Sequence, residues 1–312
     1  AKLKQKTKGE KRLMFPKFKK ITLQNGLQIY HIPMNKGSGV ISVDVFYNVG
    51  SRDETMGKSG IAHMLEHLNF KSTKNRKAGE FDAIVKGFGG VNNASTGFDY
   101  THYFIKCASS NLEVCLDLYA DIMQNLSLKD KEFQPERKVV LEERLWRTDN
   151  DPFGYLFFRL YNAAFLYHPY HWTPIGFRKD IENWSIKDIK EFHAKFYQPR
   201  NAVLLITGDI GEKAAFDAAK KHFAPVKNKG EIPRLHCTEP AQDGEKLSVI
   251  YKSSEAQIVA VAFKIPPFNH PDAAAIKAMD IYLSGGKSSL LQRVLVDEKK
   301  LANQINIYDM SG

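Results

Sequence analysis

The chain has 312 residues, 43% of them hydrophobic, which is enough to bury one or two cores in an ordinary globular protein. Its formal net charge of +10 suggests nucleic-acid binding, but residues 1–20 hold nine of the Lys and Arg side chains and one acid, which leaves only +2 for the rest. A short Lys-rich arm is typically a solvated tail, so no nucleic-acid partner is expected. No apolar run approaches the roughly eighteen residues that a membrane span needs, so none is expected.

Strand-like and helix-like patterns are mixed in the part of the chain that follows this arm. Alternating apolar residues about Asn25-Gly26 predict a β-hairpin over 21–32. The other expected elements are a strand over 40–49, helices over 58–70 and 78–90, a strand pair around Gly97 (92–108), helices over 110–125, 131–149, 152–165 and 186–197, a buried strand over 202–209, and a helix ending near 223. Such a mixture without strict alternation is typical of the α+β class.

The remaining third of the chain begins with a stretch rich in proline and glycine, 224–245, which is the best linker candidate. Strands are then predicted within 246–265, followed by helices over 271–284 and 287–299. This order weakly repeats the opening of the first part. We therefore expect a basic arm (1–20), a first domain (21–223), the linker, and an incomplete second domain of the same kind (246–312).

The three cysteines do not form a recognisable framework. Cys107, Cys115 and Cys237 are odd in number and lack a CxxC spacing, so neither a disulfide scaffold nor a four-cysteine zinc site fits. Cys107 and Cys115 lie in apolar segments, and both are interpreted as small core residues.

The stretch "GIAHMLEHLNF" (60–70) places two histidines and an acid in an apolar segment. On a helix His63 and His67 share one face, with Glu66 beside them. Two imidazoles suit zinc, and Glu66 could take a proton from a water held by that metal. The alternative is an amphipathic helix with histidines as polar neighbours, but burying all three groups unpaired would cost several kcal/mol. The HxxEH order is also a known metallopeptidase signature.

A third metal ligand is sought in "PERKVVLEERLWR" (135–147), which is predicted to be helical. Glu136 and Glu143 are seven residues apart, two turns along one face, with Val139 and Val140 between them on that face. These two acids are therefore expected to point inward, and Glu142 elsewhere. A solvated charged helix remains an equally good interpretation from the residues alone.

Together these residues resemble the M16 family of inverted-motif zinc peptidases, which includes pitrilysin, insulin-degrading enzyme and mitochondrial processing peptidase. "GIAHMLEHLNFKST" is followed by Glu143, 76 residues after His67. The resemblance runs from about residue 21 to the end of the chain. Further blocks fall where the family has its recurring blocks: "NVGSRDE" (48–54), "NASTGFDYTHY" (93–103), "ERKVVLEE" (136–143), "PIGFRKDI" (174–181) and "YQPRNAVLLITGDI" (197–210).

The resemblance implies tandem domains, each a mainly antiparallel sheet covered by helices. It also implies that His63, His67 and Glu143 bind Zn²⁺ and that Glu66 is the general base. Glu136 would not bind the metal itself but would orient one of the metal ligands. Within "NNAST", Asn93 and Ala94 would contact an extended peptide substrate that adds as a strand. The expected activity is that of a zinc metalloendopeptidase that hydrolyses extended or unfolded peptides.

This sequence departs from the family pattern in the second domain. An arginine and a tyrosine that contact substrate in the family are replaced here by Val296 and Asn303. Family members that pair as heterodimers divide such tasks, so a homo- or heterodimer with another M16 subunit is expected, with this chain as the zinc-holding subunit.

Two other functions remain as alternatives. One is a non-catalytic core or assembly subunit that binds peptides or partner proteins without cleaving them, although such subunits commonly lose the motif that is intact here. The other is a metal-dependent lyase with the same HxxEH order, whose family is much shorter. The chain begins with Ala1, as a bacterial protein with its signal peptide removed would, so the periplasm is favoured over the cytoplasm.

Overall fold

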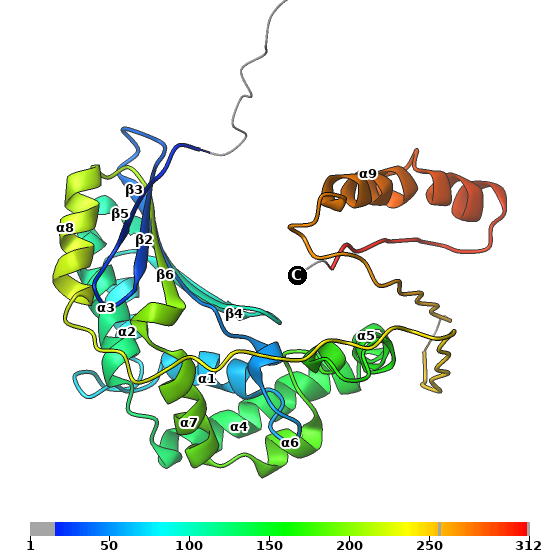
Figure 1. Ribbon diagram of the computed structural model, residues 1–312, viewed down its shortest axis with the longest axis horizontal. Helices are drawn as coiled ribbons and strands as arrows, with labels where there is room; N and C mark the ends of the chain where they lie inside the picture. Colours follow the sequence, from blue (N-terminus) through cyan, green and yellow to red (C-terminus); the bar gives the residue numbers. More distant parts are fainter. Residues whose placement is uncertain (1–15, 255–256, 311–312) are drawn as a thin grey trace, which may run out of the picture. The chain divides into compact units, whose positions relative to one another are not determined.

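The computed structural model describes residues 16–254 and 257–310. These residues form two compact units, divided between residues 256 and 257 (Figure 1). Residues 1–15 of the expected basic arm lie outside the described residues, and Lys19 and Lys20 already belong to the first strand. None of the helices in the described part of the chain is long and apolar enough to cross a membrane.

The first unit is built on one six-stranded mixed sheet with the order β1-β2-β6-β3-β5-β4. All neighbouring strands are antiparallel except β2 and β6, which are parallel and join residues about 175 apart in the sequence, as in the pair Gln28 and Val203. The predicted hairpins around Asn25-Gly26 and around Gly97 are confirmed. The strands are β1 (Lys19–Thr22), β2 (Gln28–Pro33), β3 (Val40–Tyr47), β4 (Val91–Thr96), β5 (Thr101–Ala108) and β6 (Ala202–Gly208).

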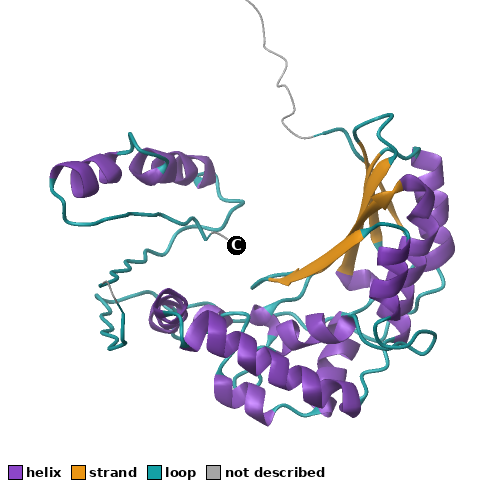
Figure 2. Ribbon diagram, turned by 180° about the vertical axis from the view of Figure 1, so that it is seen from behind, coloured by secondary structure: helices purple, strands orange, loops and turns teal. Residues whose placement is uncertain are grey.

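Helices cover one face of this sheet, and the α+β class is confirmed (Figure 2). The alternate residues Ile41, Val43 and Val45 of β3 are buried toward that layer, where α3 contacts β3 and α8 contacts β2. A second group of helices, which includes α1, lies at one end of the sheet (Figure 1). The helices of this unit are α1 (Ile61–Asn69), α2 (Glu80–Gly87), α3 (Leu112–Asn125), α4 (Asp130–Arg144), α5 (Pro152–Ala164), α6 (Arg178–Asn183), α7 (Ile186–Phe196) and α8 (Glu212–Phe223).

Shorter helical turns complete the first unit. A π-helical turn, Leu145–Asp149, follows α4 directly, and 3-10 turns occur at Ser51–Asp53, Ser109–Asn111, Pro169–His171 and Pro199–Asn201. π-turns are frequent next to functional sites because they widen the helix locally. Here the π-turn begins two residues after Glu143.

The segment 224–254, which includes the linker expected over 224–245, has no helix or strand, and it is anchored along the first unit. The Asn228 side-chain amide donates to the Asn25 carbonyl oxygen at 2.8 Å. The Glu239 carboxylate accepts from the successive backbone N–H groups of residues 166–168 at 2.7–2.9 Å. This segment is therefore a strap on the surface rather than a free tether.

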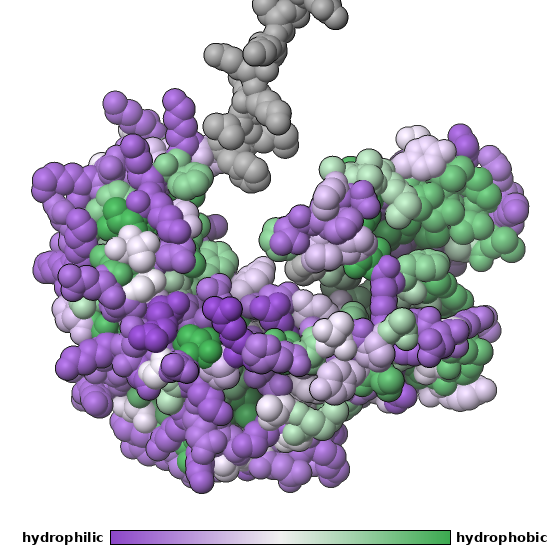
Figure 3. Space-filling model, in the orientation of Figure 1, coloured by the Kyte–Doolittle hydropathy of each residue, from purple (hydrophilic) through white to green (hydrophobic). Residues whose placement is uncertain are grey.

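The second unit holds helix α9 (Ala273–Ser284) and a π-helical turn, Gln292–Glu298, within the two predicted helical regions. The strands predicted within 246–265 are wrong, because the described residues of that range form none. A strand needs a neighbour to satisfy its backbone hydrogen bonds, and no described segment pairs with this one. Its alternating apolar side chains are exposed instead, with Tyr251 at 93% and Phe263 at 83%. Apolar side chains also gather on the surface of the second unit (Figure 3). Met279 and Ile281 of α9 are among its exposed large hydrophobic residues.

Candidate metal centre and active site

Helix α1 carries the HxxEH residues and begins at a constrained glycine. Gly60 has a φ of 87°, in the left-handed region that favours glycine. A Cβ atom there would lie 2.8 Å from both the Ile175 carbonyl oxygen and a ring carbon of Trp184. The start of α1 is thus held tightly against the residues on either side of α6, while Met64, Leu65 and Leu68 are buried in the core.

The first turn of α1 is capped by a buried side chain from outside the helix. One carboxylate oxygen of Glu54 accepts the backbone N–H of Gly60 at 2.7 Å, and the other accepts that of Ala62 at 2.8 Å. The indole N–H of Trp172 donates to the same carboxylate at 2.9 Å. Burial raises the pKa of Glu54, and the three donors oppose that shift. Glu54 therefore satisfies N–H groups that no residue of α1 could satisfy.

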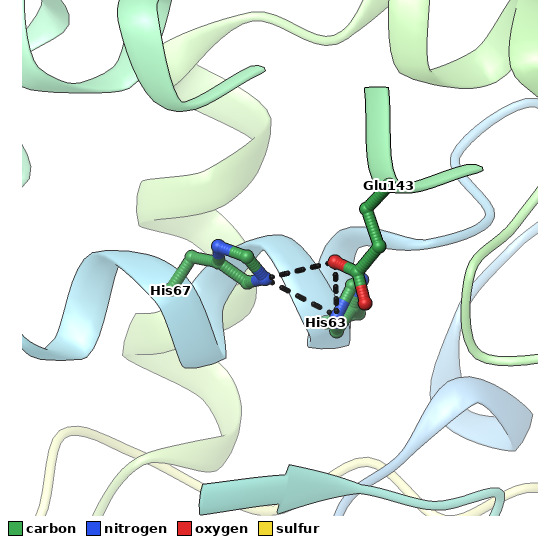
Figure 4. A group of neighbouring side chains, drawn as sticks. All are labelled: His63, His67 and Glu143. Carbon is green, nitrogen blue, oxygen red and sulfur yellow. Dashed lines mark hydrogen bonds and ion pairs between the residues drawn. The ribbon is translucent and has the colours of Figure 1, made fainter. Parts of the chain in front are cut away.

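His63 and His67 project from the same face of α1 toward Glu143 of α4, and their nearest atoms converge (Figure 4). The two Nε2 atoms are 3.2 Å apart. Glu143 Oε2 lies 3.5 Å from His63 Nε2 and 3.4 Å from His67 Nε2. Among the described residues this is the only group of three His, Cys, Asp or Glu side chains close enough to hold a metal ion.

Helix α4 presents its two acids to α1 as the seven-residue spacing predicts. Glu136 and Glu143 are partly buried and reach the histidines, whereas Glu142 is exposed, as expected. The prediction for the valines between them is half right: Val140 is buried, but Val139 is 49% exposed. The buried face of α4 is therefore narrower than predicted: it includes Val140 but leaves Val139 largely exposed to solvent.

Glu136 does not join the group of three but lies behind it. Its Oε1 lies 2.9 Å from His67 Nδ1, the nitrogen opposite the one that faces Glu143. Its Oε2 forms an ion pair with Lys71 Nζ at 2.6 Å. Glu136 therefore fixes the orientation of the His67 ring, and Lys71 fixes Glu136.

The pKa values of the two histidines are shifted in opposite directions. Burial, helped by the neighbouring His67, lowers the pKa of His63 to about 4 against the pull of Glu143. Burial alone would also lower the pKa of His67, but the carboxylates of Glu136 and Glu143 outweigh it and raise the pKa to about 9. The hydrogen bond from His67 holds the pKa of Glu143 below its usual range. The carboxylates of Glu136 and Glu143 therefore favour a cation at this place.

Glu66 faces β4 rather than the group of three. It accepts a hydrogen bond from the Thr96 hydroxyl, at the end of β4. Burial raises the pKa of Glu66, while Thr96 and the nearby His67 oppose that rise. A carboxylate with a raised pKa is better suited to taking and giving a proton near neutral pH.

Asn93 and Ala94 lie on β4, which is the last strand on its side of the sheet. Asn93 is exposed, and its side-chain oxygen accepts the backbone N–H of Ala94 at 2.9 Å. The same short strand that carries these two residues ends at Thr96, beside Glu66. The structure thus brings the predicted substrate strand and the histidine motif to one place.

The donor set fits zinc in chemistry and in spacing. A tetrahedral Zn²⁺ with bonds of about 2.0–2.1 Å separates its ligand atoms by about 3.3–3.4 Å. The three donor atoms here are 3.2, 3.4 and 3.5 Å apart. Two imidazoles and one carboxylate also form a set that leaves a fourth position open, as catalytic zinc sites require.

Comparison with known proteins identifies the family. Two family models match: "Insulinase (Peptidase family M16)" over residues 33–170 and "Peptidase M16 inactive domain" over residues 183–312. The zinc protease PqqE of Helicobacter pylori is 56% identical over 298 residues, which cover 95% of this chain and 67% of that protein. The chain belongs to peptidase family M16. It is a metallopeptidase of that family, and several of its relatives are named zinc proteases.

Solved structures of M16 proteins share this fold. A crystal structure of a protease from Helicobacter pylori superposes with a TM-score of 0.89 at 54% identity, covering 95% of this M16 chain and 72% of the other. The first half of the periplasmic protease PqqL from Escherichia coli gives a TM-score of 0.66 at 22% identity, over 73% of this chain and 51% of that one, which shows the fold alone. The chain spans about two thirds of the length of its curated relatives, 67% of one and 64% of another. The alternative of a non-catalytic subunit is not favoured by these comparisons.

Four residues around this M16 site were not singled out from the sequence. Glu54 lies within a block quoted for the resemblance, but nothing local shows that it caps α1 from six residues away. Thr96, Lys71 and Trp172 act through contacts that only the folded chain creates. The one sequence signal that could have indicated Glu54 is an acidic residue shortly before a helix that starts with glycine.

Proposed function

We propose that this chain is a zinc metalloendopeptidase that hydrolyses extended or unfolded peptides. His63, His67 and Glu143 hold the zinc, and Glu66 acts as general base. The proposal rests above all on one observation: three donor atoms converge at 3.2–3.5 Å beside a carboxylate that is hydrogen-bonded to the last strand of the sheet. A zinc ion held by these residues would lower the pKa of a water molecule and polarise a carbonyl group.

The residues around the zinc divide the work of peptide hydrolysis. Glu66 takes a proton from the attacking water as its oxygen bonds to the peptide carbon. It then gives that proton to the departing nitrogen as the C–N bond breaks, which leaves a carboxylic acid and an amine. The acid then loses its remaining proton to the solvent or to the amine. Thr96 holds Glu66 in place for both transfers, and Glu136 keeps the ring of His67 turned toward the site.

An extended peptide is the substrate class that suits β4. The strand has no neighbour on one side among the described strands, so its backbone can pair with an added strand at Asn93 and Ala94. Backbone pairing depends little on side chains, which favours unfolded segments of many sequences. Pairing near Thr96 brings the peptide backbone close to Glu66.

The test compares hydrolysis of an unstructured fluorogenic peptide by the zinc-loaded chain and by its Glu66→Gln variant. Glu142→Gln is the matched control, because it makes the same change on the exposed face of α4. We expect Glu66→Gln to lose at least about 100-fold in kcat/KM with unchanged zinc content, and the control to keep full activity. Equal activity in Glu66→Gln, or no hydrolysis by a zinc-loaded chain with and without a second M16 subunit, would overturn the proposal.

A second M16 subunit and a periplasmic location belong to the same proposal. Val296 and Asn303, which replace the substrate-contacting pair of the family, motivate a partner that supplies the missing contacts. Sedimentation of the chain alone and with a co-expressed M16 subunit tests the dimer, and a single monomeric species in both settings would exclude it. The fold shared with the periplasmic PqqL motivates the location, which cell fractionation tests.

A further inference from the structure

Two of the three cysteines meet in the core although they lie on different elements. Cys107 is the seventh residue of β5, and Cys115 is the fourth residue of α3. A short 3-10 turn, Ser109–Asn111, reverses the chain between them. The two side chains are 6% and 0% exposed, and no other described cysteine is buried with them.

Their sulfur atoms are close enough for chemistry. The two Sγ atoms are 3.5 Å apart, against about 2.05 Å in a disulfide. Forming the bond requires the two Sγ atoms to move about 1.5 Å closer, by rotation about the Cα–Cβ bond of each residue. The hydrogen bond from Cys115 also lowers the pKa of Cys107, which favours Cys107 as the thiolate that reacts first.

The position of the pair gives a bond between them a structural effect. Cys107 stands opposite Ile41 of β3 in the middle of the sheet, and β5 pairs on its other side with β4. A covalent link would therefore join α3, in the covering layer, to the strand that supports the edge of the sheet. This effect is independent of the zinc site and of any peptidase activity.

We propose that Cys107 and Cys115 form a reversible disulfide when the chain folds or resides in a thiol-oxidising compartment. The oxidant is a low-molecular-weight disulfide such as oxidised glutathione. The Cys107 thiolate attacks it, forms a mixed disulfide and releases one glutathione thiolate. Cys115 then loses its proton, attacks the Cys107 sulfur and releases the second glutathione. Two protein thiols are oxidised to one disulfide, and one glutathione disulfide is reduced to two thiols.

The experiment refolds the reduced chain in a glutathione redox buffer, blocks free thiols with N-ethylmaleimide under denaturing conditions, and measures intact mass and tryptic peptides. Refolding lets the oxidant reach the thiols before they are buried. We expect one blocked thiol, Cys237, and a single tryptic peptide, residues 107–129, that contains both Cys107 and Cys115 joined to each other and unblocked. Dithiothreitol should restore three blocked thiols.

Three variants define the controls. Cys237→Ser should still form the bond and show no blocked thiol, whereas Cys107→Ser and Cys115→Ser should each leave the remaining core cysteine blocked. In the Cys237→Ser background the oxidised chain should melt on the order of 5 °C higher than the reduced one. Three free thiols after refolding, a bridge that contains Cys237, or glutathione retained on Cys107 without ring closure would each overturn the proposal.

Discussion

The capping of α1 by Glu54 makes the sharpest prediction about stability. Replacing Glu54 with alanine removes the acceptor of two backbone N–H groups, those of Gly60 and Ala62. The indole N–H of Trp172 loses one of its two acceptors but keeps the Ser51 carbonyl oxygen at 3.0 Å. The variant therefore leaves two buried donors without a partner and weakens a third.

The expected cost follows from that count. A buried donor without an acceptor costs about 1–3 kcal/mol, so two of them cost about 2–6 kcal/mol. Removing the carboxylate also relieves the penalty of burying a charge, since Glu54 is only 4% exposed, which moves the expected loss toward the lower half of this range. We expect Glu54→Ala to lower the free energy of unfolding by about 2–4 kcal/mol. Glu54→Gln, which keeps one acceptor oxygen, should lower it by about half as much.

Urea unfolding at neutral pH measures this loss from the change in midpoint at constant slope. Glu245→Ala is the control, because Glu245 is exposed and lies in the segment 224–254, which has no helix or strand. A loss below about 1 kcal/mol for Glu54→Ala, or a loss no larger than that of the control, would refute the reasoning. It would mean that, without Glu54, the backbone N–H groups of Gly60 and Ala62 find other hydrogen-bond acceptors, such as water.

Two further predictions concern charged pairs. Glu136→Gln should weaken zinc binding by about 10–100-fold, because His67 loses the carboxylate that orients its ring; competition with a chelator measures this, and an unchanged affinity would contradict it. Asp188 has its pKa lowered to about 2: burial opposes the shift, but hydrogen bonds from Lys58 and Ser185 outweigh it. Because the folded-state pKa lies below the unfolded value of about 3.9, its contribution to stability is present at neutral pH and is lost as the pH falls toward 2. Asp188→Asn should therefore destabilise the chain at pH 7 by about 1 kcal/mol or less, with a difference that shrinks below pH 4 in urea unfolding; a constant difference would contradict the assignment.

Local patterns in the sequence predicted the elements that local patterns control. Asn25-Gly26 and Gly97 mark tight turns whose flanking strands pair with each other, so both hairpins could be placed. The spacing of His63 and His67, and that of Glu136 and Glu143, follows from the helix repeat, so the side of each helix that carries chemistry could also be predicted. That α1 and α4 face one another rested on the resemblance to M16 peptidases.

Features that depend on partners far along the chain could not be predicted. The parallel pairing of β2 with β6 joins residues about 175 apart, and no local signal selects it. The strands expected within 246–265 have the right alternation but no described strand to pair with, so the pattern alone misled. Likewise, Cys107 and Cys115 were correctly placed in the core, but their closeness depends on how α3 packs on the sheet.

The exposed edge of β4 has a consequence for protein aggregation. An uncovered strand edge is a template on which other chains, including copies of the same protein, can add and grow into fibrils. Here the Asn93 side chain already occupies the Ala94 N–H, so an incoming strand must displace it before it can pair. A chain that pairs with β4 comes to lie beside Glu66, and under the proposed function it is hydrolysed there. Under that proposal, fibril growth and substrate binding begin with the same event at this edge, and a chain that would seed a fibril would be degraded instead.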